Sequence, residues 1–187
     1  MRCLEVLLNG EVVCRAGHER AMRFVARLVV VSLLASTAVA ETTLPTASLP
    51  SARALLSEID LSGARVVLRR LWANEPQFEA LCTFIESADP NWLEVARRLK
   101  SASDAAASLS LNYSVARALP VAPDRVLKLV GQGFTIDDIC TSPYIEPQAG
   151  VAERYEQRAL KALASLSDPA LGAVARQCSA RVRLPKR

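Results

Sequence analysis

Residues 89–119 read DPNWLEVARRLKSASDAAASLSLNYSVARAL, and the first part of this stretch has the pattern of an amphipathic helix. Asp89 can accept hydrogen bonds from the free backbone N–H groups at a helix start, and Pro90 suits the first helical position. Apolar residues then follow at the spacing of one helix face, namely Trp92, Val95, Ala96 and Leu99. The pattern predicts a helix that begins directly after Asp89.

The second part of the stretch predicts another helix after a short turn. Ser103 or Asp104 can cap it, good helix formers follow, and Pro120 ends it. Its expected inward face consists of Leu109, Tyr113, Ala116 and Leu119. Because so short a connection favours antiparallel packing, the two helices are expected to form a hairpin.

The same signals recur on both sides of this hairpin. Capping residues followed by apolar residues at helical spacing predict helices near residues 51–62, 64–72, 75–85, 123–130, 151–166 and 169–181. For FTIDDIC, residues 134–140, a single helical turn is favoured over a strand because no partner strand is visible. We therefore expect an all-α fold, an orthogonal or antiparallel array of seven or eight short helices, with a single domain over residues 51–187. A degenerate helical repeat is the alternative, since Asp-Pro and Pro-Asp helix starts recur.

Residues 89–140, from the start of the hairpin to a cysteine, resemble a block found in an uncharacterised family of small exported, all-helical bacterial proteins. The resemblance brings no catalytic motif. It implies that the helix containing Trp92, the helix after it and the segment that ends in Cys140 form one structural unit.

The segment that begins at Met22 has the features of a secretory signal peptide. Arg23 and Arg27 give it a cationic start, an apolar run follows, and Ala38 and Ala40 have the spacing of small residues that signal peptidase recognises. The uncharged run is shorter than the roughly 20 apolar residues that a membrane-spanning helix needs. We expect cleavage after Ala40 and a periplasmic or secreted protein.

This expected signal divides the N-terminal part of the chain. Residues 1–21 precede a plausible initiator and are interpreted as an upstream mis-start, and residues 41–50 are expected to form a flexible leader. From Glu41 on, the chain has 18 Lys or Arg and 16 Asp or Glu. The resulting net charge of +2 is not the balance of a nucleic-acid-binding domain.

Three cysteines follow the expected signal, namely Cys82, Cys140 and Cys178. In an oxidising compartment an odd count indicates one disulfide and one free thiol. We expect Cys140 to pair with Cys178, which would pin the last helix to the middle of the domain, and Cys82 to be reduced and buried beside Phe78. The two pairings through Cys82 are the alternatives, because sequence alone does not fix connectivity.

The residues that could carry chemistry predict no catalytic and no metal site. The one histidine, His18, precedes the expected signal, which removes histidine-dependent triads and the commonest zinc ligand. Glu86 is expected to be a solvated residue ahead of the next helix. Asp137 and Asp138, with Glu146 beyond the following loop, are interpreted as helix-start charges rather than a calcium or acid–base site. No cofactor is expected.

Two tryptophans and one apolar loop are the large apolar features that could take part in binding. Trp72 and Trp92 are expected to pack in the core, because helical spacing turns them inward. Pro143, Tyr144 and Ile145 form an apolar loop segment in a proline-rich stretch, which would be stiff and therefore easily presented to a partner. We interpret this loop as the candidate interaction surface.

These features favour a non-catalytic exported helical domain, not an enzyme, that binds another macromolecule in the cell envelope, most simply another envelope or secreted protein. One alternative is a hydrolase of envelope polymers that works through carboxylates such as Glu86, Asp137 or Asp138. Another is a carrier of a small apolar ligand. Nucleic acid is not an expected partner, and the processed chain is not expected to span a membrane.

Overall fold

The computed structural model describes residues 48–183, all within one compact unit. In this part the chain forms nine α-helices, one 3-10 turn and no strand, which confirms the all-α prediction. The proposed mis-start, the signal peptide, most of the leader and the last four residues lie outside the described residues. The helices are α1 (Ala52–Ser62), α2 (Ala64–Trp72), α3 (Glu75–Glu86), α4 (Pro90–Lys100), α5 (Ala105–Ala118), α6 (Pro123–Leu127), α7 (Ile136–Cys140), α8 (Val151–Ala164) and α9 (Gly172–Val182), with η1 (Pro169–Leu171) as the 3-10 turn.

Short polar side chains start the helices where the sequence predicts them. Ser51, Asn74, Asp89, Asp104 and Asp168 each accept a hydrogen bond from a backbone N–H of the first turn that they precede. These bonds satisfy N–H groups that have no partner within the helix. The segment 134–140 contains the expected helical turn, α7, and the described residues form nine α-helices where seven or eight were expected.

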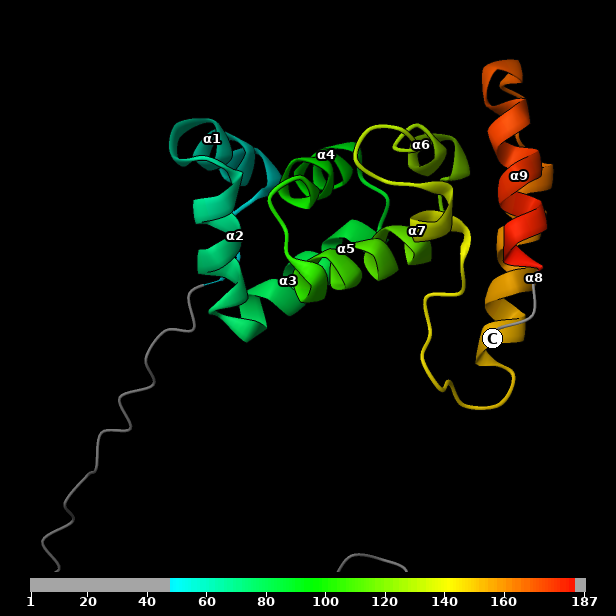
Figure 1. Cartoon of the computed structure of the whole chain (residues 1–187), viewed down its shortest axis with the longest axis horizontal. Coiled ribbons are helices and arrows are strands. Elements are labelled where there is room, and N and C mark those ends of the chain that lie inside the picture. Colours follow the sequence, from blue (N-terminus) through cyan, green and yellow to red (C-terminus); the bar gives the residue numbers. More distant parts are fainter. Residues whose placement is uncertain (1–47, 184–187) are drawn as a thin grey trace, which may run out of the picture. The chain divides into compact units, whose positions relative to one another are not determined.

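Figure 1 shows how the helices are arranged, and their buried apolar side chains form one continuous core. Helices α3 and α5 lie side by side, and α4 packs against α1, α2, α3 and α5. The short α7 contacts both α5 and α9, and α9 in turn lies beside α8. The segment 89–119 therefore forms the middle of the domain, with α1 and α2 on one side and the last two helices on the other.

The inward face of α5 differs only in part from the predicted one, since Ala116 and Leu119 are buried as expected. Leu111 and Val115 are fully buried, whereas Leu109 is 45 % exposed. The buried residues of α5 are Ala107, Leu111, Ser114, Val115, Ala116 and Ala118. Leu109 and Leu111 both lie in a run of small residues, so the sequence alone allows either leucine to face inward. The packing of α5 against α3 and α7 places Leu111 inward.

Candidate functional site

A disulfide between Cys140 and Cys178 joins α7 to α9. This is the pairing that the sequence favoured, and both cysteines are completely buried. Cys82 is free, as expected, but it is half-buried rather than buried. Burial raises the pKa of the Cys82 thiol, although a hydrogen bond with Ser114 opposes the shift, so the thiol stays protonated at neutral pH.

Arg117 of α5 organises the loop that the sequence proposed as an interaction surface. Its Nη2 donates to the carbonyl oxygen of Pro143 (3.1 Å), and its guanidinium lies 5.3 Å from the centre of the Tyr144 ring. Its Nη1 donates to Glu86 Oε1 (3.0 Å). Glu86 is therefore half-buried in an ion pair and is not simply solvated.

The structure exposes only one of the three residues proposed for that surface. Pro143 is buried, and the half-buried Tyr144 packs edge-on against Tyr155, with ring centres 5.7 Å apart. Ile145 is 69 % exposed. Pro143 and Tyr144 thus hold the loop against α5 and α8, and only Ile145 exposes its apolar side chain to solvent.

Replacing Tyr155 with Phe should lower the free energy of unfolding by about 1 kcal/mol. The Tyr155 hydroxyl donates to the carbonyl oxygen of Ala116 (2.8 Å), and this carbonyl keeps a second hydrogen bond, from Leu119 N (3.1 Å). Loss of the hydroxyl therefore removes a bond without leaving the carbonyl unpaired. Urea denaturation at neutral pH measures the effect.

The same variant should also change how stability depends on pH. Burial raises the pKa of the Tyr155 hydroxyl above its ordinary value of 10.0, so the folded state keeps a proton that the unfolded state loses. The protonated Tyr155 hydroxyl therefore contributes stability that is fully present below pH 10 and is lost as the pH rises above 10. The wild type should lose stability more steeply above pH 10 than Tyr155→Phe, whereas an equal slope for the two proteins would contradict the assignment.

The acidic residues Asp137, Asp138 and Glu146 do not come together in one site, because they have different surroundings. Asp137 forms an ion pair with Arg181 of α9. Asp138 accepts from the backbone N–H of Thr135 (2.8 Å) in a capping box and from Asn112 of α5 (2.5 Å). Glu146 is exposed, and the described residues contain no group of three His, Cys, Asp or Glu that could hold a metal ion. The adjacent carboxylates thus act as helix-start charges and tertiary contacts.

The two tryptophans are less buried than expected. Trp72 is 44 % exposed, which contradicts its prediction as a core residue, and its ring meets the edge of Phe78 at a centre distance of 4.8 Å. The inward positions of α2 are filled by Val67, Leu68 and Leu71 instead. Trp92 is half-buried and stacks face to face on Phe84, which is 45 % exposed.

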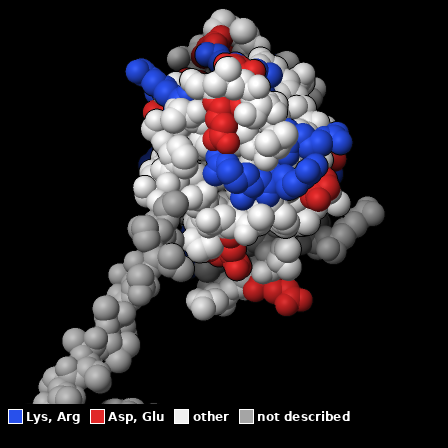
Figure 2. Space-filling view, turned by 90° about the vertical axis from the view of Figure 1, so that its left-hand side faces the viewer, with Lys and Arg blue, Asp and Glu red and all other residues white. Residues whose placement is uncertain are grey.

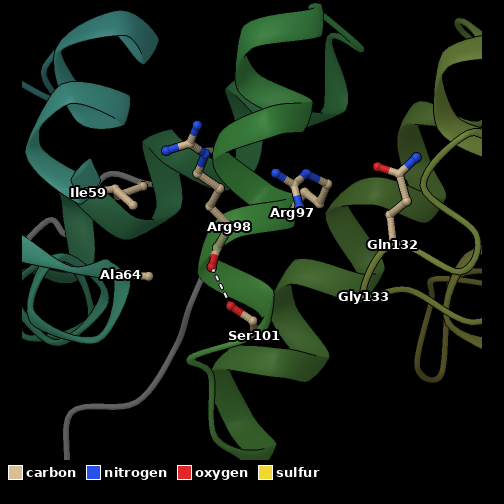
Figure 3. A pocket seen from close by; sticks show the side chains of 7 residues that line it. All are labelled: Ile59, Ala64, Arg97, Arg98, Ser101, Gln132 and Gly133. Atoms are coloured by element: carbon tan, nitrogen blue, oxygen red, sulfur yellow. Dashed lines mark hydrogen bonds between the residues drawn. The ribbon is translucent and has the colours of Figure 1, made fainter.

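Two neighbouring hollows lie on the side of the domain that contains α2. The first has a volume of about 420 Å³ and is shown in Figure 3. Arg97 and Arg98 of α4 stand in its middle, between α1 and α2 on one side and the loop after α6 on the other. Its lining consists of Ile59, Ala64, Arg97, Arg98, Ser101, Gln132 and Gly133.

The second hollow has a volume of about 350 Å³ and lies between α2 and the start of α5. Its lining includes Arg65, Leu68, Arg69, Trp72, Asp104 and Ala107. The linings of the two hollows include sequence neighbours, namely Ala64 and Arg65 in α2 and Ser101 and Ala102 after α4. We call the two hollows together the arginine groove, since four arginines line it.

These arginines differ in how they are neutralised. Glu94 accepts from Nε of both Arg97 (2.7 Å) and Arg98 (2.8 Å), which lowers the pKa of its carboxyl to about 2, and Arg98 also pairs with Asp60. In contrast, Arg65 and Arg69 are exposed and form no ion pair or side-chain hydrogen bond within residues 48–183. Figure 2, which faces the side where α1 and α2 lie, shows Lys and Arg side chains joined in a band across it.

The sequence interpretation missed this groove. A signal was present, since Arg65, Arg69 and Trp72 are spaced as i, i+4 and i+7 and therefore share one face of α2. Trp72 was assigned inward because it ends an apolar stripe. The opposite wall comes from the connection between α4 and α5, about 35 residues later in the chain, and no local pattern indicates that contact.

None of the helices within residues 48–183 is long and apolar enough to cross a membrane. The resemblance of residues 89–140 to exported helical proteins stays a prediction. Comparison with known proteins gave no match to the chain, whether to a family model, to a curated protein or to a solved structure.

Proposed function

We propose that this protein is an exported, non-catalytic helical domain that binds another protein of the cell envelope or the secreted fraction. The observation that carries the proposal is the exposed face of α2, where a half-exposed tryptophan and two arginines with no ion pair among residues 48–183 border an open hollow. Arg and Trp are enriched among the residues that contribute most to protein–protein binding. The rigid scaffold behind this face, a packed helical core with a disulfide, suits a preformed binding surface.

Export is supported by the disulfide and by the sequence of the N-terminal segment. Disulfides persist mainly in oxidising compartments outside the cytosol. The segment from Met22 to Ala40, which lies outside the described residues, has the composition of a signal peptide. Together they favour a periplasmic or secreted location.

The two alternative functions have less support in the geometry. A carboxylate-dependent hydrolase needs two carboxyl groups roughly 5–10 Å apart and facing the same bond. Here Glu86 pairs with Arg117, Asp137 with Arg181, and Asp138 caps α7. A carrier of an apolar ligand calls for an apolar cavity, whereas arginines line both hollows described above.

Site-specific photo-crosslinking in the cells that produce the protein tests the proposal. Benzoylphenylalanine placed at Trp72 should give an adduct that contains a second polypeptide, because it replaces an exposed aromatic residue beside the groove. The same residue at Arg176, which is exposed on α9, serves as the control and should give none.

A third position separates the two candidate surfaces. An adduct from Ile145 but not from Trp72 would keep protein binding and move the surface to the loop. Adducts that contain only polysaccharide or lipid, or no adduct from any position, would contradict the proposal.

A further inference from the structure

We infer that the arginine groove binds an acidic, extended segment of the partner protein, with two carboxylates on Arg65 and Arg69 and an apolar side chain on Trp72. The inference rests on the proposed function, which it deepens by naming the surface and the chemistry of the partner.

The arginines of α2 differ in their partners, and this difference identifies which of them can bind a ligand. Arg70 forms a tertiary contact within the domain, since its Nε and Nη2 donate to the two carboxylate oxygens of Glu58 (3.0 and 2.7 Å). In contrast, Arg65 and Arg69 are exposed and line the second hollow without an acidic partner in the described part of the chain. A carboxylate supplied from outside would provide the charge-assisted, bidentate hydrogen bonds that a guanidinium favours.

The walls of the second hollow favour a peptide over a sugar polymer. Leu68, Trp72 and Ala107 supply apolar surface. Of the polar groups opposite, Ser103 Oγ donates to the carbonyl oxygen of Lys100 (2.8 Å), and Asp104 Oδ1 accepts from Ala107 N (3.1 Å). Hydroxyls or carboxylates of a sugar could also bind Arg65 and Arg69, but an aliphatic side chain of a peptide would bury more apolar area against the tryptophan.

The arginine groove carries a net positive lining even when its one acidic residue is included, so it favours an anion. Four arginines and one aspartate, Asp104, line the two hollows. Glu94 and Asp60 partly neutralise Arg97 and Arg98, so the field of the first hollow is weaker. The strongest attraction for a carboxylate is consequently expected at Arg65 and Arg69.

The spacing along α2 sets the sequence pattern of the partner segment. Arg65 and Arg69 are separated by about 6 Å of helix rise, and Trp72 lies about 4.5 Å further on. In an extended chain, every second residue projects to the same side at intervals of about 6.6–6.8 Å. Acidic residues at the first and third positions would therefore match Arg65 and Arg69, and an apolar residue at the fifth position would lie about 3 Å beyond Trp72 along the helix, a distance that the large indole ring can span.

Fluorescence anisotropy with a labelled peptide, Gly-Glu-Ser-Glu-Ser-Leu-Gly, tests the inference with the exported protein purified as the cell processes it. The double variant Arg65→Gln, Arg69→Gln should weaken binding about tenfold. Glutamine keeps a similar helix propensity, so the fold should be retained, which circular dichroism verifies. The matched control, Arg158→Gln with Arg176→Gln, removes two exposed arginines from α8 and α9 and should leave the affinity within about twofold.

Two further ligands identify what is recognised. A peptide with serine in place of leucine should bind several-fold more weakly, because it loses the contact with Trp72. Polygalacturonate, a polymer of acidic sugars, should compete poorly at equal carboxylate concentration. If the serine peptide binds as tightly as the parent and polygalacturonate competes fully, the groove recognises charge alone and the inference is overturned.

The two proposals fail in different ways. Equal weakening by both double arginine variants, or no binding of the parent peptide, would overturn the acidic-peptide inference. Protein adducts from Trp72 would still support the proposed function in either case.

Discussion

Replacing both Cys140 and Cys178 with serine should lower the free energy of unfolding by about 4 kcal/mol. The disulfide closes a loop of 38 residues, and a cross-link of that length restricts the unfolded chain strongly. It also joins α7 to α9, two elements at the ends of a segment that includes the long loop before α8. Urea denaturation of the wild type and the double variant, followed by far-UV circular dichroism, measures the difference.

The free cysteine provides the control for this experiment. Cys82→Ser removes a half-buried thiol and closes no loop, so it should cost about 1 kcal/mol or less. A reducing agent should lower the stability of the wild type and of Cys82→Ser equally and leave the double variant unchanged. A wild type that is insensitive to the reducing agent would show that the disulfide does not stabilise this fold.

The starts of the helices could be predicted because the interactions that define them are local. Asp89 and Asp104 accept hydrogen bonds from backbone groups two or three residues ahead, so the sequence contains both partners. The same holds for the capping box of Thr135 and Asp138, which decides the ambiguous segment before Cys140 in favour of a helical turn. The all-α class follows from these starts and from the apolar spacing after them.

The candidate site could not be predicted in the same way because its parts come from distant segments. The arginine groove forms where α2 meets the connection between α4 and α5, and that contact depends on how the core packs. Trp72 illustrates the difference, since its spacing suits an inward position while Leu68 and Leu71 already fill the core. Likewise, Arg117 fixes the loop through the carbonyl of Pro143, which removes that residue from the surface.

The orientation of α5 leads to the second large expected effect. Leu111→Ala should lower the free energy of unfolding by about 2–5 kcal/mol, because Leu111 is fully buried and its truncation leaves a cavity in a packed core. Helix α5 contacts α3, α4, α6 and α7, so few neighbours can move to fill the space. Chemical denaturation monitored by far-UV circular dichroism gives the value.

Leu109→Ala is the matched control, since it makes the same chemical change two residues earlier on the same helix. Leu109 is 45 % exposed, so its truncation should change the free energy of unfolding by no more than about 0.5 kcal/mol. Helix propensity cancels between the two variants because both replace leucine with alanine in the interior of α5. The difference therefore reports burial alone, and a larger loss for Leu109→Ala than for Leu111→Ala would show that Leu109, and not Leu111, faces the core.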